Sequence, residues 1–132
     1  MAEYLFSYGT LQPELAPAEI ASVIRQFRPI GRASIAGILY DLGDYPGAVL
    51  GETNLRVWGQ VFELPKDPGV LRQLDEYEEF DPAEIESSQF VRTECDGTLE
   101  SGTMIKVWVY MYNREPGSAP RIASGSFAGR KK

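Results

Sequence analysis

Hydrophobic side chains recur along the chain with two different spacings, which predict several strands and two helices. Residues 55–65 and 102–112 alternate their apolar positions with the two-residue period of a strand. In residues 102–112 both faces are apolar or aromatic, which indicates a central strand covered on both sides. Residues 17–27, and a segment that begins near Gly69, instead repeat their apolar residues at helical spacing.

Further strands complete the predicted order of elements. Residues 3–9 are rich in aromatics and end at a glycine, as a strand does when it enters a tight turn. Beta-branched and small residues predict extended structure over 29–42, 45–49 and 87–95, with turn residues between these segments. Many strands with two short helices favour an α+β domain whose sheet is strongly curved or closed into a small barrel.

The composition changes abruptly after Tyr112. Residues 1–112 have the length and apolar content of one domain with a single core. Residues 113–132 are rich in Gly, Ser and Pro, which predicts a flexible, basic C-terminal tail. This tail carries a net charge of +4, whereas the rest of the chain carries −10. The acidic body argues against nucleic acid as a partner, because phosphate binding requires clustered Lys and Arg.

The residue types that the chain lacks restrict its chemistry. It contains no histidine, which excludes the Ser-His-Asp arrangement and histidine-ligated zinc. Cys95 is the only cysteine, which excludes an internal disulfide and a multi-thiolate metal site. Any proton transfer would therefore fall to a carboxylate, a lysine or a tyrosine. No apolar run is long enough to cross a bilayer and the N-terminus does not resemble a signal peptide, so we expect a cytoplasmic protein without a membrane partner.

Four carboxylates crowd the sequence LRQLDEYEEF at residues 71–80, and helical geometry divides them into two groups. At about 100° per residue, Glu78 falls between Leu71 and Leu74 on the apolar side of the helix. The other three fall at the edge of that side or beyond it, where a solvated charged face is expected: Asp75, Glu76 and Glu79.

Two explanations fit a carboxylate on the apolar side. Burial without a partner is costly or raises the pKa of the carboxyl group. In the first explanation the helix ends before Tyr77, or Glu78 pairs with a cation such as Arg92. In the second, Glu78 lies in a cleft with a raised pKa, which suits proton transfer near neutral pH.

The turn after the first strand is a second candidate for chemistry. The sequence YGTLQ at residues 8–12 can direct the backbone N–H groups of Gly9, Thr10 and Leu11 toward solvent. Exposed N–H groups of this kind bind small anions and carboxylates.

Six blocks of sequence occur in an order that resembles the γ-glutamylcyclotransferase-like family, also called the AIG2-like family. They cover roughly residues 3–112 and read YLFSYGTLQ, LYDLGDYPGAV, VWGQVFELP, LRQLDEYEEF, FVRT and VWVYMY. In size the chain is most similar to bacterial members and to the γ-glutamylamine cyclotransferase branch. The resemblance implies a compact mixed β-barrel with short flanking helices and a cavity on one side.

The resemblance also implies particular site residues. In the family a glutamate after a Leu-Asp-x-aromatic sequence is catalytic, which here is Glu78. A family loop that binds substrate through backbone amides corresponds to Tyr8, Gly9, Thr10 and Leu11. Expected pocket residues are Tyr45, Pro46, Gly47 and Tyr110. Where the family commonly has Tyr-x-Arg, this chain has Phe90 and Arg92, and Arg92 is expected to support the site or to form an ion pair.

Together these features predict an enzyme that cyclises a γ-glutamyl amine or γ-glutamyl amino acid to 5-oxoproline and releases the amine. Glu78 would be the general acid and base, and the resemblance implies no metal or organic cofactor. Two alternatives stay open: a module that binds a small carboxylate or amine without turning it over, and an interaction protein whose basic tail docks on an acidic partner.

Overall fold

The computed structural model describes residues 3–9, 18–43 and 46–126. Its first four elements are β1 (Tyr4–Ser7), α1 (Ala18–Ile24), β2 (Arg28–Asp41) and β3 (Pro46–Leu50). The remaining elements are β4 (Arg56–Glu63), α2 (Pro68–Tyr77), the short 3₁₀ helix η1 (Ile85–Ser87), β5 (Phe90–Leu99) and β6 (Met104–Tyr112).

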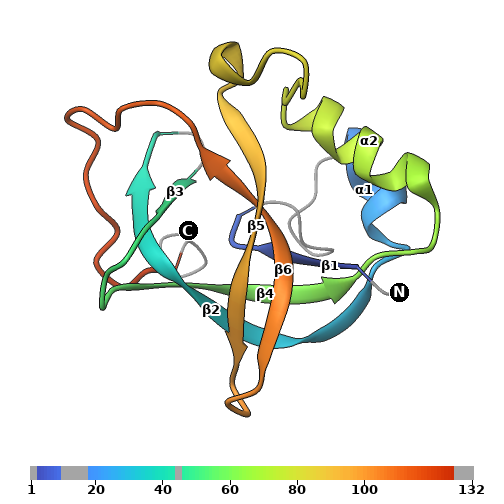
Figure 1. The fold of residues 1–132 in the computed structure, drawn as a ribbon, viewed down its shortest axis with the longest axis horizontal. Helices are drawn as coiled ribbons and strands as arrows, with labels where there is room; N and C mark the ends of the chain where they lie inside the picture. Colours follow the sequence, from blue (N-terminus) through green and yellow to red (C-terminus); the bar gives the residue numbers. More distant parts are fainter. Residues whose placement is uncertain (1–2, 10–17, 44–45, 127–132) are drawn as a thin grey trace.

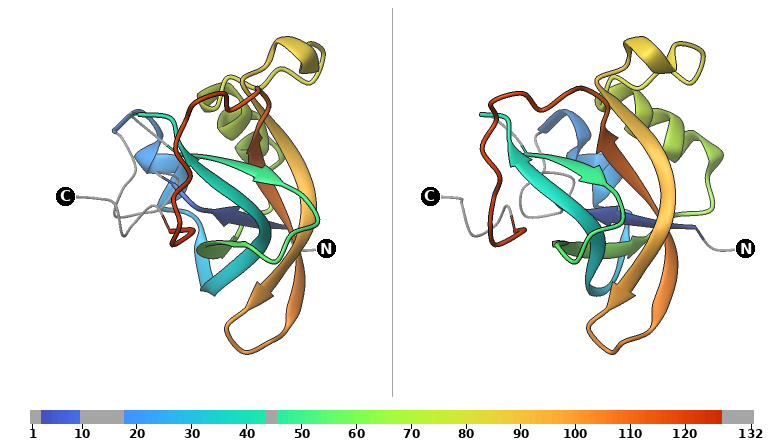
Figure 2. Two further views of the ribbon diagram at one scale, coloured as in Figure 1. Left: turned by 90° about the vertical axis from the view of Figure 1, so that its left-hand side faces the viewer. Right: turned by 60° about the vertical axis from the view of Figure 1, so that its left-hand side comes forward.

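Five strands close into a mixed barrel, which confirms the predicted fold. Around the barrel the strands are ordered β2, β4, β1, β6 and β5, and β5 returns to pair with β2 at Ala33 and Ser34. The neighbours are antiparallel except β1 and β6, which are parallel. β3 extends the sheet outside this ring through its pairing with β2. Figures 1 and 2 show the curved ring with α1 and α2 together on one side.

Alternation along the strands separates two apolar clusters, one inside the barrel and one between the barrel and the helices. On β1, Phe6 belongs to the first cluster and Leu5 to the second. On β6, Val107 and Val109 pack in the barrel core, whereas Tyr110 packs on the helix side. This arrangement confirms the predicted strand with two covered faces.

Local sequence fixes where α2 begins. The Asp67 side chain accepts a hydrogen bond of 2.9 Å from the backbone N–H of Gly69, and Pro68 occupies the first turn, where its missing N–H costs nothing. Val70 and Leu74 are buried in the cluster between the helices and the barrel. The helix therefore runs along the barrel wall and brings its C-terminal end to the barrel rim.

Residues 113–126 pack against the barrel, whereas their composition predicts a flexible tail. They leave β6 and run along the outside of β2 and β3 (Figure 1). The backbone N–H of Asp41 donates to the carbonyl of Pro120 at 2.8 Å, and the N–H of Ile122 donates to the carbonyl of Leu39 at 2.8 Å. The Ile122 side chain is only 5% exposed and belongs to the barrel cluster.

Gly125 brings the end of this segment against β4. Its carbonyl accepts a hydrogen bond of 2.7 Å from the backbone N–H of Trp58, and its φ of 72° lies in the left-handed region. A Cβ atom at this position would come within 2.0 Å of the Arg56 carbonyl oxygen. Glycine thus permits a close backbone contact here. The rest of the predicted tail, residues 127–132, lies outside the described residues.

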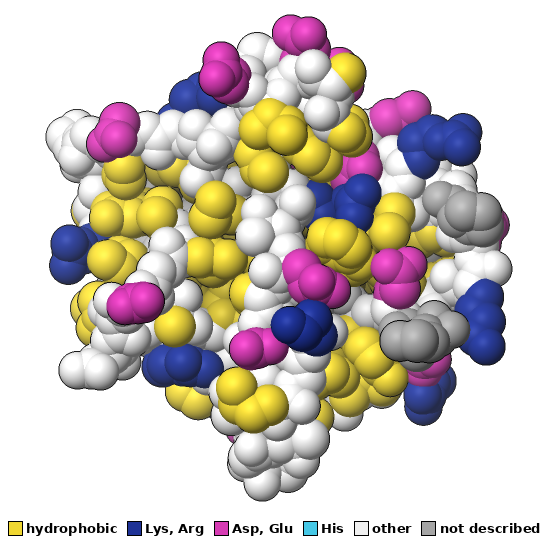
Figure 3. Space-filling view, viewed as in Figure 1, with side chains coloured by type: hydrophobic (Ala, Val, Ile, Leu, Met, Phe, Trp, Pro, Cys, Tyr) yellow, Lys and Arg dark blue, Asp and Glu magenta, His cyan; other side chains and the backbone are white. Residues whose placement is uncertain are grey.

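Charged side chains are mixed on the face of the molecule shown in Figure 3. Lys and Arg alternate there with Asp and Glu and do not gather into one patch. Within the described ranges, none of the helices is both long and apolar enough to span a bilayer.

We predict that Ile122→Ala lowers the free energy of unfolding by about 2–4 kcal/mol, because it removes buried side-chain atoms from the barrel core. The matched control is Ile85→Ala, since the Ile85 side chain is 51% exposed, and its effect should stay within about 0.5 kcal/mol. Urea unfolding followed by tryptophan fluorescence measures both. Equal effects of the two substitutions would show that residues 113–126 do not contribute to the folded domain.

Candidate active site

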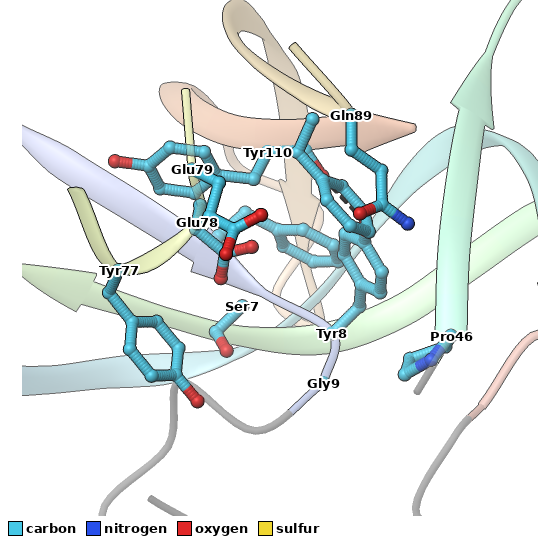
Figure 4. A pocket seen from close by; sticks show the side chains of 11 residues that line it. Ser7, Tyr8, Gly9, Pro46, Tyr77, Glu78, Glu79, Gln89 and Tyr110 are labelled. Atoms are coloured by element: carbon cyan, nitrogen blue, oxygen red, sulfur yellow. Dashed lines mark hydrogen bonds between the residues drawn. The ribbon is translucent and has the colours of Figure 1, made fainter. Parts of the chain in front are cut away.

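A pocket with a volume of about 290 Å³ opens where β1, α2 and β6 meet (Figure 4). Its size suits part or all of a small molecule. Among the residues that the structure describes, the lining contributes two carboxylates and three phenol rings, and none of these lining residues is Lys or Arg. They are Phe6, Ser7, Tyr8, Gly9, Pro46, Tyr77, Glu78, Glu79, Gln89, Phe90 and Tyr110.

Tyr8, directly after β1, joins three elements beneath the pocket. Its hydroxyl donates a hydrogen bond of 2.6 Å to the backbone carbonyl of Tyr110 on β6. The same hydroxyl accepts a hydrogen bond of 3.1 Å from the backbone N–H of Ala48 on β3. Burial raises the pKa of Tyr8, and the negative charge of Glu78 raises it further. Tyr8 therefore stays neutral and serves to fix the pocket floor.

Gly9 follows Tyr8 and lies against the β3 side of the pocket. A Cβ atom at this position would approach the Pro46 ring to 3.3 Å. Ser7, the last residue of β1, passes close to Gly59 on β4. A Cβ atom on Gly59 would lie 2.2 Å from the Ser7 carbonyl oxygen. These two close approaches determine where the loop at residues 8 and 9 emerges from the barrel.

Glu78 caps the C-terminal end of α2, and its side chain lines the pocket. Burial raises the pKa of its carboxyl group from 4.5 to about 7, and the neighbouring charge of Glu79 contributes to the increase. A carboxyl group with this pKa is populated in both its protonated and ionised forms near neutral pH. It can therefore take a proton from a bound molecule and return it.

Asp75 lies one helical turn before Glu78 and is almost completely buried, with 7% of its surface exposed. Arg92 on β5 donates two hydrogen bonds to its carboxylate, of 2.8 Å from Nε and 3.2 Å from a terminal nitrogen. The hydroxyl of Tyr110 donates a third, of 2.7 Å, to Oδ1 of Asp75. These contacts hold the end of α2 against β5 and β6.

A second layer of contacts supports Arg92. Its guanidinium lies over the indole ring of Trp108, with its central carbon 4.5 Å from the ring centroid. The indole N–H of Trp108 in turn donates a hydrogen bond of 3.0 Å to the Glu3 carboxylate. The cation is thus held between a carboxylate and an aromatic face, an arrangement that the planar guanidinium favours.

The structure corrects three expectations about the acidic sequence. Asp75 was expected on the solvated face but is buried, because the partners that satisfy its charge come from β5 and β6. Arg92 was a possible partner for Glu78 but binds Asp75 instead. The helix also extends through Tyr77, so the explanation in which it ends earlier is wrong. Glu76 and Glu79 are exposed, as expected.

The pocket brings together several residues that the sequence selected: Tyr8, Gly9, Pro46, Glu78 and Tyr110. Gly47 is not among the lining residues. It packs closely against two other side chains, since a Cβ atom here would lie 2.7 Å from the Leu42 side chain and 3.1 Å from that of Tyr112. Arg92 also lies outside the lining, where it binds Asp75. Three expected residues lie outside the described ranges: Thr10, Leu11 and Tyr45.

Sequence reasoning missed several lining residues, chiefly Ser7, Tyr77, Glu79 and Gln89. Tyr77 and Glu79 flank Glu78, so their adjacency was an available signal. Gln89 carries no pattern that marks it, because it lies between η1 and β5. Among the residues that the structure describes, no cluster of three or more Cys, Asp or Glu side chains could hold a metal ion.

A family model described as Gamma-glutamyl cyclotransferase, AIG2-like matches residues 5–129. The chain belongs to this family. The match continues past Tyr112 and includes the segment that packs against β2 and β4. No curated protein sequence matched the chain.

Solved structures share the fold of this AIG2-like chain. Protein ytfP from Escherichia coli is 28% identical with a TM-score of 0.66, and the alignment covers 98% of this chain and 99% of that one. An AIG2-like protein from Mus musculus is 21% identical with a TM-score of 0.72, covering 96% and 88%. A structure named gamma-glutamyl cyclotransferase is 21% identical with a TM-score of 0.65, covering 92% and 72%.

We predict that Asp75→Asn lowers the free energy of unfolding by about 2–3 kcal/mol, because it leaves Arg92 without its counter-charge in a largely buried position. Glu76→Gln is the control, since this neighbouring side chain is exposed, and its effect should be within about 0.5 kcal/mol. Chemical denaturation measures both. If Asp75→Asn were as stable as the control, the ion pair would not hold α2 in place.

A second prediction concerns stability and pH. Because the pKa of Glu78 is raised to about 7 in the folded protein, the stability associated with its proton is complete below about pH 4.5 and is lost as the pH rises through 7. Glu78→Gln cannot ionise. Its stability relative to wild type should therefore increase between pH 5 and pH 8.5, by about 2–3 kcal/mol. Thermal melts at several pH values test this, and a pH-independent difference would contradict the raised pKa.

Proposed function

We propose that this AIG2-like protein is a cyclotransferase that converts a γ-glutamyl amine or γ-glutamyl amino acid to 5-oxoproline and releases the amine. The main support for the proposal is the position of Glu78. Its carboxyl group lines a pocket of small-molecule size, and its pKa is raised to about 7. In a chain without histidine, this group is suited to acid–base chemistry near neutral pH.

The reaction needs one proton shuttle. The ionised Glu78 carboxylate removes a proton from the α-ammonium of the substrate, and the freed amine attacks the γ-carbonyl carbon. A new C–N bond closes the five-membered ring. As the original amide C–N bond breaks, protonated Glu78 gives its proton to the departing nitrogen. The ring nitrogen loses a second proton by the same route, and the amine leaves as an ammonium ion. No proton or electron is gained or lost overall, so the residues require no co-reactant.

Ring closure within one molecule places most of the catalytic demand on orientation. The protein has to hold the substrate folded, with its amine near its own carbonyl, and orientation of this kind gives large rate increases. The rigid floor made by Tyr8, Tyr110 and the β3 backbone suits this task. The pocket is therefore expected to select the shape of the γ-glutamyl group.

Backbone N–H groups are candidate donors for the substrate carboxylate, because exposed N–H groups bind small anions. None of the described lining residues is Lys or Arg. We propose that the loop at Gly9, Thr10 and Leu11 supplies these N–H groups, as the family pattern implies. The same groups could stabilise negative charge on the γ-carbonyl oxygen in the transition state.

The family supports an enzymatic function with a small-molecule substrate. The matching model is described as a gamma-glutamyl cyclotransferase family, and one structure with this fold carries that name. The proposed substrates differ in their leaving group, which is an amino acid in some and a simple amine in others, so both kinds are tested.

The test is to incubate the protein with γ-glutamyl amino acids and γ-glutamylamines and to measure 5-oxoproline by mass spectrometry. Wild type should form the product, and Glu78→Gln should reduce kcat by about 10²–10⁴, the usual contribution of a general acid or base. Glu76→Gln keeps an exposed helix position and should retain wild-type activity.

A pure binding module on the same scaffold predicts a different result. The protein would then be stabilised by γ-glutamyl compounds in thermal melts, yet no 5-oxoproline would form with any of them. Wild-type activity in Glu78→Gln would instead reject Glu78 as the proton shuttle while leaving the cyclotransferase activity in place.

A further inference from the structure

The C-terminal end of α2 is closed by a pattern of hydrogen bonds that normally ends in glycine. The N–H of Phe80 donates to the carbonyl of Asp75 at 2.8 Å, and the N–H of Glu79 donates to that of Glu76 at 3.1 Å. These are the two bonds of a Schellman motif, in which the residue after the cap adopts a left-handed conformation. Here the cap is Glu78 and the left-handed residue is Glu79.

Glu79 has a φ of 58° and is the one non-glycine residue with positive φ in the part of the chain that the structure describes. Side chains with a Cβ atom disfavour this conformation, and glycine is the usual residue at this position of the motif. The chain contains 13 glycines. Five of the described glycines have a positive φ, so glycine occupies every other described position with this conformation. A glutamate at this position is therefore unfavourable for the backbone.

The side chain of Glu79 lies at the pocket. Glu78 and Glu79 both line it, and Figure 4 shows their side chains entering from the same end of α2. The Glu79 charge acts on the Glu78 carboxyl group, whereas Glu79 itself remains exposed. The Glu79 carboxylate is thus exposed to water and lies beside the more buried carboxyl group of Glu78.

We propose that Glu79 is a positioning residue for Glu78: the left-handed turn at the end of α2 sets the Glu79 carboxylate beside the Glu78 carboxyl group at the pocket rim, where a like charge acts on it. Placing this charge beside the acid–base group requires the unfavourable left-handed backbone at Glu79. The inference rests on the proposed function only for its catalytic consequence, because the protonation of Glu78 can be measured directly.

Other groups around Glu78 do not supply this effect. Tyr8 and Tyr110 approach from β1 and β6, and burial raises the pKa of both phenols, so they stay neutral. Asp75 on α2 is bound to Arg92 on β5, and the two opposite charges largely cancel at a distance. Tyr77 and Gln89 complete the nearby lining without a formal charge near neutral pH. Glu79 is therefore the charge that a substitution can remove without dismantling the pocket.

Three substitutions separate charge from backbone strain. Glu79→Gln removes the charge and keeps the unfavourable conformation. Glu79→Gly removes both the charge and the strain. Glu79→Asp keeps the charge, and aspartate adopts the left-handed conformation more readily than glutamate does. If Glu79 had only a structural role, the melting temperature would respond to these changes but the titration of Glu78 would not.

The measurement is a ¹³C NMR titration of the side-chain carboxyl carbons, with the Glu78 signal assigned by its loss in Glu78→Gln. We expect the midpoint of Glu78 to fall by roughly half a pH unit or more in Glu79→Gln and Glu79→Gly, and to stay near its wild-type value in Glu79→Asp. Glu79→Gly should show the largest rise in melting temperature, by about 2–4 °C.

Activity gives a second readout. Since the reaction starts with ionised Glu78, the acid limb of the kcat/KM profile should move to lower pH by the same amount in Glu79→Gln. An unchanged Glu78 midpoint in Glu79→Gln would overturn the inference, whether or not the enzyme is active. Absence of 5-oxoproline formation by wild type at every pH would instead reject the proposed function, and the NMR titration would still decide the role of Glu79.

Discussion

The buried carboxylate of Asp75 is the contact on which the site geometry depends. Arg92 and Tyr110 are register partners on β5 and β6, so two adjacent strands direct a guanidinium and a phenol to one point. α2 supplies the carboxylate that satisfies both. A charge in this position is tolerated only while its partners remain in place, which fixes the rotation and the depth of the helix. Glu78 lies one turn farther along, at the end of the same helix, so these contacts also determine where Glu78 lies.

Tyr110 connects Asp75 to the strands of the barrel by further hydrogen bonds. Its hydroxyl binds Asp75, and its backbone carbonyl accepts the hydroxyl of Tyr8. Tyr8 in turn receives the N–H of Ala48. A continuous series of hydrogen bonds therefore links α2, β6, β1 and β3, four elements that border the pocket. Groups held in this way are pre-organised before a ligand arrives, which is favourable where orientation is the main contribution to a reaction.

The sequence predicts features whose cause is local and misses those whose cause is distant. Strand alternation and helical spacing predicted the elements of the barrel, and the apolar neighbours Leu71 and Leu74 were enough to turn Glu78 inward. Asp75 was misjudged because its partners come from strands that follow much later. Ile122 was misjudged because Gly, Ser and Pro predict flexibility, whereas backbone hydrogen bonds to β2 order the segment. Neither distant contact has a signal in the composition of its own segment.

The position of Ile122 also bears on how the domain folds. The barrel interior is filled by side chains from β1 through β6 and then by this residue from the segment after the last strand. Its backbone partner, Leu39, belongs to β2, in the first third of the chain. Contacts between residues so far apart in sequence close large loops, and domains that depend on them fold slowly. Completion of the barrel core therefore depends on a contact that spans more than half of the chain, between the segment after β6 and β2.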